Sequence, residues 1–204
     1  MNKIENIIFD FGGVLYDISF EKAAIAFENI GFSMPEFQDE FLSVFRKLEY
    51  GNLSPNEFVI QLQMFSDHHI SEKDIFNAFD QILIGIDPDK VEDLRKLSKK
   101  YHLFLLSNTN EIHFRRYSEE IKRNLKTSDF YSLFVKEYYS YKLKMRKPDL
   151  SIFKFVIKDS KLDPNGTLFV DDSNENLIAA ATLGIQTFLI QNNDSWKILM
   201  RLLT

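Results

Sequence analysis

The chain has 204 residues, 45% of them hydrophobic, with a net charge of −5, so it can bury one substantial core with room for a smaller accessory domain. The negative charge offers no basic face for a phosphate backbone, and the absence of cysteine excludes disulfides, thiolate zinc sites and cysteine nucleophiles. No apolar stretch approaches the roughly 20 residues that cross a bilayer, and the amino terminus has no signal-peptide pattern, so we expect a cytoplasmic protein with no membrane and no nucleic-acid partner.

The first predicted strand covers residues 7–9, where three apolar β-formers precede Asp10. Such a strand delivers Asp10 to the carboxyl edge of a sheet, where open α/β sheets bind ligands. Gly12 and Gly13 follow, and their lack of side chains would let a backbone group approach a metal or a phosphate closely. The same pattern also fits an ordinary turn, so the later segments must decide between the two interpretations.

From Asp17 to Asp87 the sequence shows no strand pattern but several helix starts. Ser54, with Pro55 after it and Glu57 three residues on, is a typical helix N-cap, and Ser33 begins a similar motif. We predict about four short helices between residues 19 and 84. This length is far too great for a loop between a strand and a helix. The segment is therefore predicted to be a helical subdomain, residues 17–86, inserted into a main domain of residues 1–16 and 87–204.

The main domain resumes with a helix that begins at Asp87 and Pro88. Further strands are predicted at residues 103–106, 167–170 and 185–190, with a short extended piece near residue 139. Helices are predicted between them, over about residues 112–124, after Pro148, and around residues 176–181 before Gly184. The alternation of strand and helix is typical of an α/β fold in which helices cover both faces of a parallel sheet.

Polar residues end three of the predicted strands: Asp10, then Ser107 with Asn108, then Asp171 with Asp172. Parallel strands place their carboxyl ends on one edge, so these side chains are expected to converge. Three carboxylates brought together raise one another's pKa values and resist desolvation. A hard divalent cation resolves this conflict, and Mg²⁺ suits a set of oxygen ligands without cysteine or histidine.

Other polar residues could complete a phosphate site at the same edge. Ser107 and Asn108 offer hydroxyl and amide donors for a phosphate oxygen, although the pair also fits a simple turn. Lys147 precedes Pro148 at a predicted helix start and could aim its ammonium at this edge, or could be a solvated surface lysine. Asn176 lies one helical turn after Asp172 and could orient a carboxylate or a lysine.

Four motifs occur in order: Asp10-Phe-Gly-Gly-Val-Leu, Leu-Ser107-Asn108-Thr, Arg-Lys147-Pro-Asp, and Val-Asp171-Asp172-x-x-x-Asn176. Together they resemble the motifs of the haloacid dehalogenase-like (HAD) hydrolase superfamily. The resemblance spans the main domain and implies a Rossmann-like core, and the helical insertion resembles the small C1 cap of this superfamily. Leu-Ser-Asn-Thr-Asn and Met-Arg-Lys-Pro most resemble the bacterial α-D-glucose-1-phosphate phosphatase branch.

The resemblance implies the chemistry of the acidic residues. Asp10 would be the nucleophile, attacking phosphorus and forming an aspartyl-phosphate that water then hydrolyses. Mg²⁺ would be held by Asp10, the Gly12 carbonyl and Asp172, with Asp171 in contact or one water away.

The resemblance also implies which residues bind the phosphoryl group. At one position this sequence departs from the pattern of the superfamily. Ser107 and Asn108 would hold the phosphoryl oxygens, and Lys147 would neutralise charge in the ground and transition states. Most phosphatases of the superfamily carry a second Asp two residues after the nucleophile as general acid and base, but here that position is Gly12. General acid–base catalysis typically raises the rate by about 10²–10⁴-fold. Asp17 is a candidate substitute acid, although a role in the hinge or the cap is the alternative.

The leading prediction is a Mg²⁺-dependent phosphatase acting on a small phosphorylated metabolite, with a sugar phosphate among the candidates and the cap closing over the site. One alternative is a 2-haloacid dehalogenase, which also uses an Asp nucleophile. That chemistry has no use for Mg²⁺, and the pair Asp171-Asp172 argues against it. The other alternative is a non-catalytic protein that binds phosphate after losing its general acid. The sequence decides neither the metabolite nor the oligomeric state.

Overall fold

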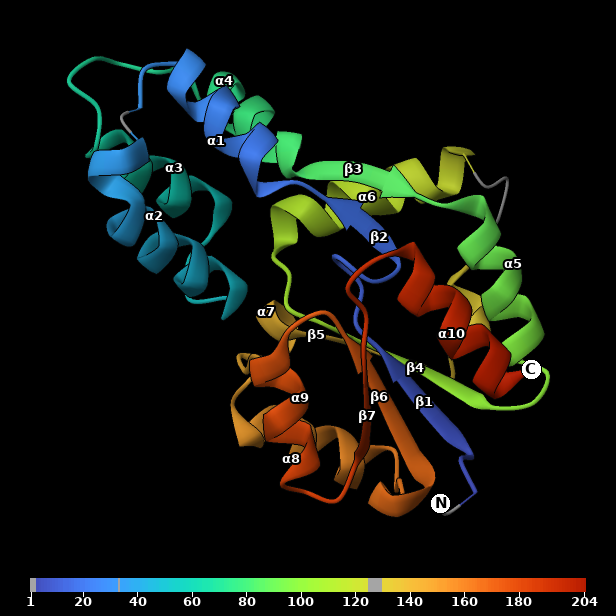
Figure 1. Ribbon diagram of the computed structural model, residues 1–204. Coiled ribbons are helices and arrows are strands. Elements are labelled where there is room, and N and C mark those ends of the chain that lie inside the picture. The colour runs from blue at the N-terminus through green and yellow to red at the C-terminus, as the bar shows by residue number, and fades with distance from the viewer. Residues whose placement is uncertain (1–2, 33, 125–129) are drawn as a thin grey trace.

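The structure is a computed structural model that describes residues 3–32, 34–124 and 130–204, so the helix start predicted at Ser33 lies outside the described residues. Within these ranges the main sheet has five parallel strands in the order β5-β4-β1-β6-β7 (Figure 1). The strands are β1 Asn6–Phe9, β4 His102–Ser107, β5 Lys136–Tyr139, β6 Thr167–Asp171 and β7 Gln186–Leu189. β1 lies at the centre, with Ile8 beside Phe104 on one neighbour and Phe169 on the other.

Helices cover both faces of this sheet, as Figure 1 shows. One face packs against α5 (Pro88–Leu97), α6 (Glu111–Asn124) and α10 (Asn193–Leu203), and the other against α8 (Leu150–Asp159) and α9 (Asn174–Ala181). The alternation of side chains along a strand explains the division, because Ile7 and Phe9 enter the first core and Ile8 enters the second. The predicted α/β fold with a Rossmann-like sheet is confirmed.

The inserted helices lie beyond the carboxyl edge of the sheet and have a core of their own. They are α1 Phe20–Asn29, α2 Met34–Glu49, α3 Pro55–Gln63 and α4 Glu72–Phe79. Phe27, Phe58 and Phe79 are central to this core, with Phe58 and Phe79 in ring contact at 4.6 Å. The capping box predicted at Ser54 forms, since Ser54 Oγ accepts from Glu57 N and the Glu57 carboxylate accepts from Ser54 N. The predicted helices between residues 19 and 84 are therefore confirmed.

The prediction of no strand between residues 17 and 87 is wrong. β2 (Tyr16–Ile18) and β3 (Leu83–Ile86) pair antiparallel and form a ribbon that joins the sheet domain to the inserted helices. These strands span three and four residues, and Gly85 interrupts the second at φ +151°. Segments this short carry too few alternating positions for a pattern to be recognised.

The helix α10 was also not predicted. Its apolar residues Trp196, Leu199 and Leu203 follow helical spacing and pack on the first core. Short elements complete the described chain: 3₁₀ turns at Asp80–Ile82, Tyr131–Leu133 and Pro164–Gly166, and the single helical turn α7 at Ser140–Leu143. Among the described residues, no helix combines the length and the apolar character that crossing a membrane requires.

Candidate active site

The carboxyl ends of β1, β4 and β6 meet at a cavity of about 310 Å³ between the sheet and the inserted helices. Asp10 follows β1, Ser107 ends β4 and Asp171 ends β6. The convergence predicted from sequence is therefore confirmed. The polar end of the cavity is lined by Asp10, Gly12, Ser107, Asn108, Lys147, Asp172, Ser173 and Asn176.

Lys147 lies at the centre of this polar end. Its Nζ is 2.6 Å from Asp10 Oδ1 and 2.6 Å from Asp171 Oδ2, and only 1% of its side chain is exposed. The interpretation of Lys147 as a solvated surface lysine is therefore excluded. Burial lowers the pKa of Lys147, but Asp10 and Asp171 raise it, and the net shift is upward. The lysine is therefore held in its charged form.

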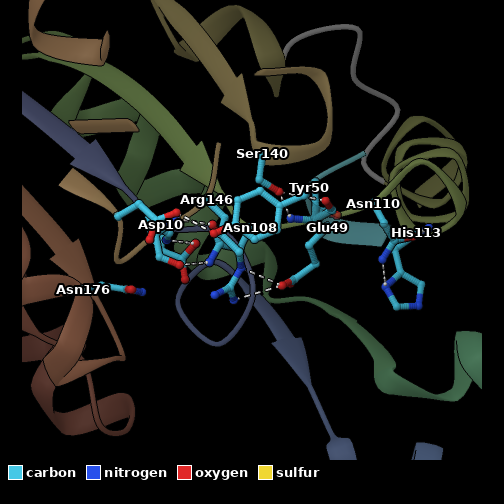
Figure 2. A network of polar contacts seen from close by, with 12 residues as sticks. Asp10, Glu49, Tyr50, Asn108, Asn110, His113, Ser140, Arg146 and Asn176 are labelled. Atoms are coloured by element: carbon cyan, nitrogen blue, oxygen red, sulfur yellow. Dashed lines mark hydrogen bonds and ion pairs between the residues drawn. The ribbon is translucent and has the colours of Figure 1, made fainter. Parts of the chain in front are cut away.

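Asn108 makes a contact that was not predicted. Its Nδ2 donates to the Lys147 carbonyl at 2.8 Å, and its Oδ1 accepts from Lys147 N at 2.9 Å (Figure 2). The side-chain amide therefore holds the backbone of Lys147 on both sides. One of the two Nδ2 hydrogens is not used in these bonds, and Asn108 lines the cavity, so its predicted contact with a phosphoryl oxygen stays a prediction.

The carboxylates of Asp10, Asp171 and Asp172 each offer an oxygen within 4.8 Å of the other two. The pKa of Asp10 is raised to about 8, the net result of burial, which raises it most, of Lys147, which lowers it, and of Asp171 and Asp172, which raise it. The pKa of Asp172 is raised by burial and then by Asp171. Asp171 is fixed by two hydrogen bonds to its Oδ1, from Ser173 N at 2.8 Å and from Asn176 Nδ2 at 2.9 Å. Asn176 therefore orients a carboxylate, as predicted.

The acidic group fits a hard divalent cation. A single ammonium faces three carboxylates within this cluster, so the group carries excess negative charge that a cation would offset. Gly13 adds a second observation: its φ is +82°, and a Cβ built there would lie 2.1 Å from Asp172 Oδ2. The turn after β1 thus approaches the Asp172 carboxylate more closely than any residue with a side chain could.

Asp17 is not brought to this cavity. Its Oδ1 lies 3.2 Å from Lys90 Nζ, its side chain is 58% exposed, and it lines a separate hollow beside Asn192. The cause is the alternation along β2, in which Tyr16 faces the active-site cavity and the next residue faces away. Asp17 cannot protonate a leaving group at Asp10 from this position, so its assignment as the substitute acid is corrected.

The other end of the cavity is formed jointly by the inserted helices and the sheet domain. Its lining is largely apolar and aromatic, and includes Tyr16, Phe20 and Phe45. Two polar residues at this end, Glu49 and His113, were missed by sequence reasoning. Nothing in the sequence points to either, since each acquires its role from a partner far away along the chain.

His113 links the sheet domain to the inserted helices. Its Nδ1 accepts from Asn110 Nδ2 at 3.1 Å, and its Nε2 donates to the carbonyl of Phe79 at 3.2 Å. The imidazole also stacks on the Phe79 ring, with centroids 3.9 Å apart. Burial lowers the pKa of His113 to about 4, so the ring is neutral near pH 7.

The chain is similar to several known proteins. The sequence model of a family described as haloacid dehalogenase-like hydrolase matches residues 4–184. A D-ribitol-5-phosphate phosphatase from Bacteroides thetaiotaomicron is 36% identical over 198 residues, which is 95% of each chain. A HAD family enzyme from the same species, solved in complex with magnesium and inorganic phosphate, is 35% identical with a TM-score of 0.86, over 96% of this chain and 98% of that one. A predicted HAD-like family hydrolase from Porphyromonas gingivalis is 32% identical with a TM-score of 0.82, over 98% of both chains.

Proposed function

Because this chain belongs to the haloacid dehalogenase-like hydrolase family, we propose that it is a Mg²⁺-dependent phosphatase that hydrolyses a small phosphorylated metabolite through an aspartyl-phosphate. The observation that carries the proposal is the buried position of Lys147 Nζ between Asp10 and Asp171, beside Asp172. This arrangement supports the proposal, because the carboxylate of Asp10 would serve as the nucleophile, Lys147 as a positive charge, and the other carboxylates as oxygen ligands, all at one end of a cavity.

Asp10 supplies the nucleophile. The pKa of Asp10 is raised overall to about 8, with burial the largest cause. Lys147 acts against this shift by favouring the ionised carboxylate, which is the form that can attack phosphorus, and a bound cation would act in the same direction. In-line attack breaks the bond between phosphorus and the leaving oxygen and forms the aspartyl-phosphate, and water then releases phosphate and regenerates the carboxylate. Lys147 is close enough to Asp10 to neutralise charge on the transferred group throughout both steps.

Asp10, Asp172 and the Gly12 carbonyl would hold Mg²⁺, with Asp171 in contact or one water away. When bound, the cation would supply positive charge that draws a phosphate dianion to the carboxylates and orients it. The magnesium and phosphate complex of the Bacteroides thetaiotaomicron enzyme supports this choice of ion. Ser107 offers a hydroxyl donor to the phosphoryl oxygens, and Asn108 holds Lys147 in place.

The substrate is proposed to be a sugar or polyol phosphate of about metabolite size. The cavity of about 310 Å³ is small, and its lining mixes aromatic rings with the polar groups Glu49, Asn110 and His113. We propose that residues 17–86 act as a cap on a catalytic domain formed by residues 1–16 and 87–204. A covered cavity of this size disfavours a phosphoprotein substrate. The D-ribitol-5-phosphate phosphatase relative supports a linear polyol phosphate, while the resemblance to the glucose-1-phosphate branch favours a hexose phosphate.

The test measures phosphate release from D-ribitol 5-phosphate, α-D-glucose 1-phosphate and p-nitrophenyl phosphate, in Mg²⁺ or in EDTA. We expect turnover by the wild type in Mg²⁺ alone, and turnover by Asp10→Asn that falls to background, because an amide cannot serve as the nucleophile. Asp17→Asn is the matched control and should stay active, since Asp17 lies outside the cavity.

Two other outcomes would contradict the proposal. Halide release from 2-chloropropionate without Mg²⁺ would favour the dehalogenase alternative. Phosphate binding with a single phosphorylation of Asp10 and no further turnover would indicate a non-catalytic phosphate-binding protein.

A further inference from the structure

The last turn of α2 contacts the loop that carries Lys147, through side chains on both sides of that residue. Glu49 Oε2 accepts from Arg146 Nε at 3.1 Å and from Arg146 Nη2 at 3.0 Å, and Glu49 is 5% exposed. Tyr50 donates its hydroxyl to Asp149 Oδ2, and the Arg146 guanidinium lies 5.9 Å from the centre of the Tyr50 ring. Figure 2 shows this network beside Asp10 and Asn108.

The backbone is also in close contact at this place. Gly51, which follows Tyr50, has φ +65°, and a Cβ built there would lie 2.2 Å from the Tyr141 carbonyl oxygen. The end of α2 therefore sits directly on α7, the turn that leads into the Lys147 loop. A side chain at position 51 would not fit in this contact, so the close approach of the two segments depends on the glycine.

Lys147 is therefore held from two directions. From the sheet, Asn108 at the end of β4 holds its backbone N–H and carbonyl. From the inserted segment, Glu49 at the end of α2 holds the preceding residue, Arg146, and Tyr50, directly after α2, holds Asp149 two positions after Lys147. Within the loop, Asp149 N donates to the Arg146 carbonyl at 3.0 Å, so a displacement at either end would be transmitted to Lys147.

We propose that Glu49 and Tyr50 are positioning residues that fix Lys147 Nζ between Asp10 and Asp171 when the inserted helices are seated on the sheet domain. This inference rests on the proposed function, in which Lys147 neutralises charge on the phosphoryl group. Its consequence is that the charged end of the site is complete only while the cavity is covered. An ion pair suits this role because its geometry is directional, whereas an apolar contact would tolerate sliding.

The experiment compares Glu49→Gln with Asp80→Asn. Asp80 pairs with Arg116 at 3.7 Å and so also joins the inserted segment to α6, but it touches neither the Lys147 loop nor the cavity. The measurements are kcat and KM for p-nitrophenyl phosphate in Mg²⁺, and amide hydrogen exchange over residues 140–150. We expect Glu49→Gln to lower kcat by roughly 10- to 100-fold with little change in KM. We also expect Glu49→Gln to exchange faster at the Lys147 amide. Asp80→Asn should leave kcat, KM and the exchange rate close to the wild-type values.

Tyr50→Phe keeps the inference testable if Glu49→Gln folds poorly, because it removes only a hydroxyl and retains the ring beside Arg146. It should shift kcat and exchange in the same direction by a smaller factor. A raised KM with unchanged kcat and exchange would overturn the inference, since Glu49 would then be a substrate contact. If the wild type shows no turnover, the proposed function fails, while hydrogen exchange still decides whether Glu49 fixes the loop.

Discussion

Gly12 leaves room for a side chain at the position where related phosphatases carry a second aspartate. A Cβ built on Gly12 meets only Ile18, at 3.5 Å and 3.7 Å, which is ordinary van der Waals contact. Gly12 also lines the cavity beside Asp10. The glycine is therefore not required by packing, unlike Gly13 next to it, whose Cβ would meet the Asp172 carboxylate.

This space leads to a prediction for Gly12→Asp. General acid catalysis helps most when the leaving oxygen is poor, so the variant should hydrolyse alkyl phosphates roughly 10- to 100-fold faster while p-nitrophenyl phosphate changes little. The measurement is the ratio of kcat/KM for the two substrate types, with Gly12→Asn as a control that has the same shape and no acidic proton. An unchanged ratio in Gly12→Asp would mean that leaving-group protonation does not limit the enzyme.

Residues fixed by local pattern could be predicted, and residues fixed by distant partners could not. Asp10 and Asp171 each end a buried strand, so their meeting follows from the parallel sheet alone. The hold of Asn108 on the Lys147 backbone was not predicted, because the two residues are 39 positions apart in the sequence. Glu49 was missed because it pairs with Arg146, 97 residues further on.

At the scale of elements, the turn between β1 and β2 brings backbone to the acidic cluster. Gly13 N donates to the Tyr16 carbonyl at 2.8 Å, and Tyr16 N donates to the Phe11 carbonyl at 2.8 Å, so the turn is tight. Lys90 reaches it from α5 and donates to the Val14 carbonyl at 2.9 Å. This turn could not be predicted in detail because β2 itself was not recognised. Recognising β2 would also have placed Asp17 on the side opposite Tyr16.

Gly13→Ala should therefore lose Mg²⁺ affinity by roughly tenfold or more, because Cβ would displace the Asp172 carboxylate from a geometry that small hard cations demand. Isothermal titration calorimetry with Mg²⁺ measures this. Gly184→Ala is a matched control, since Gly184 has nearly the same φ, +84°, but a Cβ there would meet only Pro164 and Asn165, at 3.7 Å and beyond. Both variants carry the left-handed backbone penalty of about 1–2 kcal/mol. Equal loss of Mg²⁺ affinity in both would show that the contact with Asp172 is not the cause.

At the scale of the whole molecule, the site lies between two bodies that each have a core. The sheet domain contributes the charged end of the cavity, and the inserted helices close the apolar end. Beyond the β2–β3 ribbon, the described contacts between the two bodies include Glu49 with Arg146 at one side and His113 with Phe79 at the other. The division into two bodies could be predicted from helix signals, whereas the contacts between them carry no local signature.

His113 gives this docking a dependence on pH. The folded protein holds the imidazole neutral, because its Nε2–H is given to the Phe79 carbonyl and its surroundings exclude water. The pKa of His113 is lowered to about 4 in the folded state, against about 6.5 for a histidine in an unfolded chain. Between these values the unfolded chain binds a proton that the folded protein does not. The contribution of His113 to stability is therefore full above pH 6.5 and is lost as the pH falls toward 4.

The free energy of unfolding of the wild type, relative to His113→Gln, should accordingly fall by about 2–3 kcal/mol between pH 7.5 and pH 4.5. Taking the difference between the two proteins removes the opposing contribution of carboxyls such as Asp10, whose raised pKa acts in the other direction. Urea unfolding at the two pH values measures this difference in the free energy of unfolding. His69→Gln is a control that removes an exposed histidine. A difference that stays constant with pH would mean that His113 can accept a proton without leaving Phe79. In that case the inserted helices would remain docked at low pH. Any loss of wild-type stability in acid would then have to come from groups in the sheet domain.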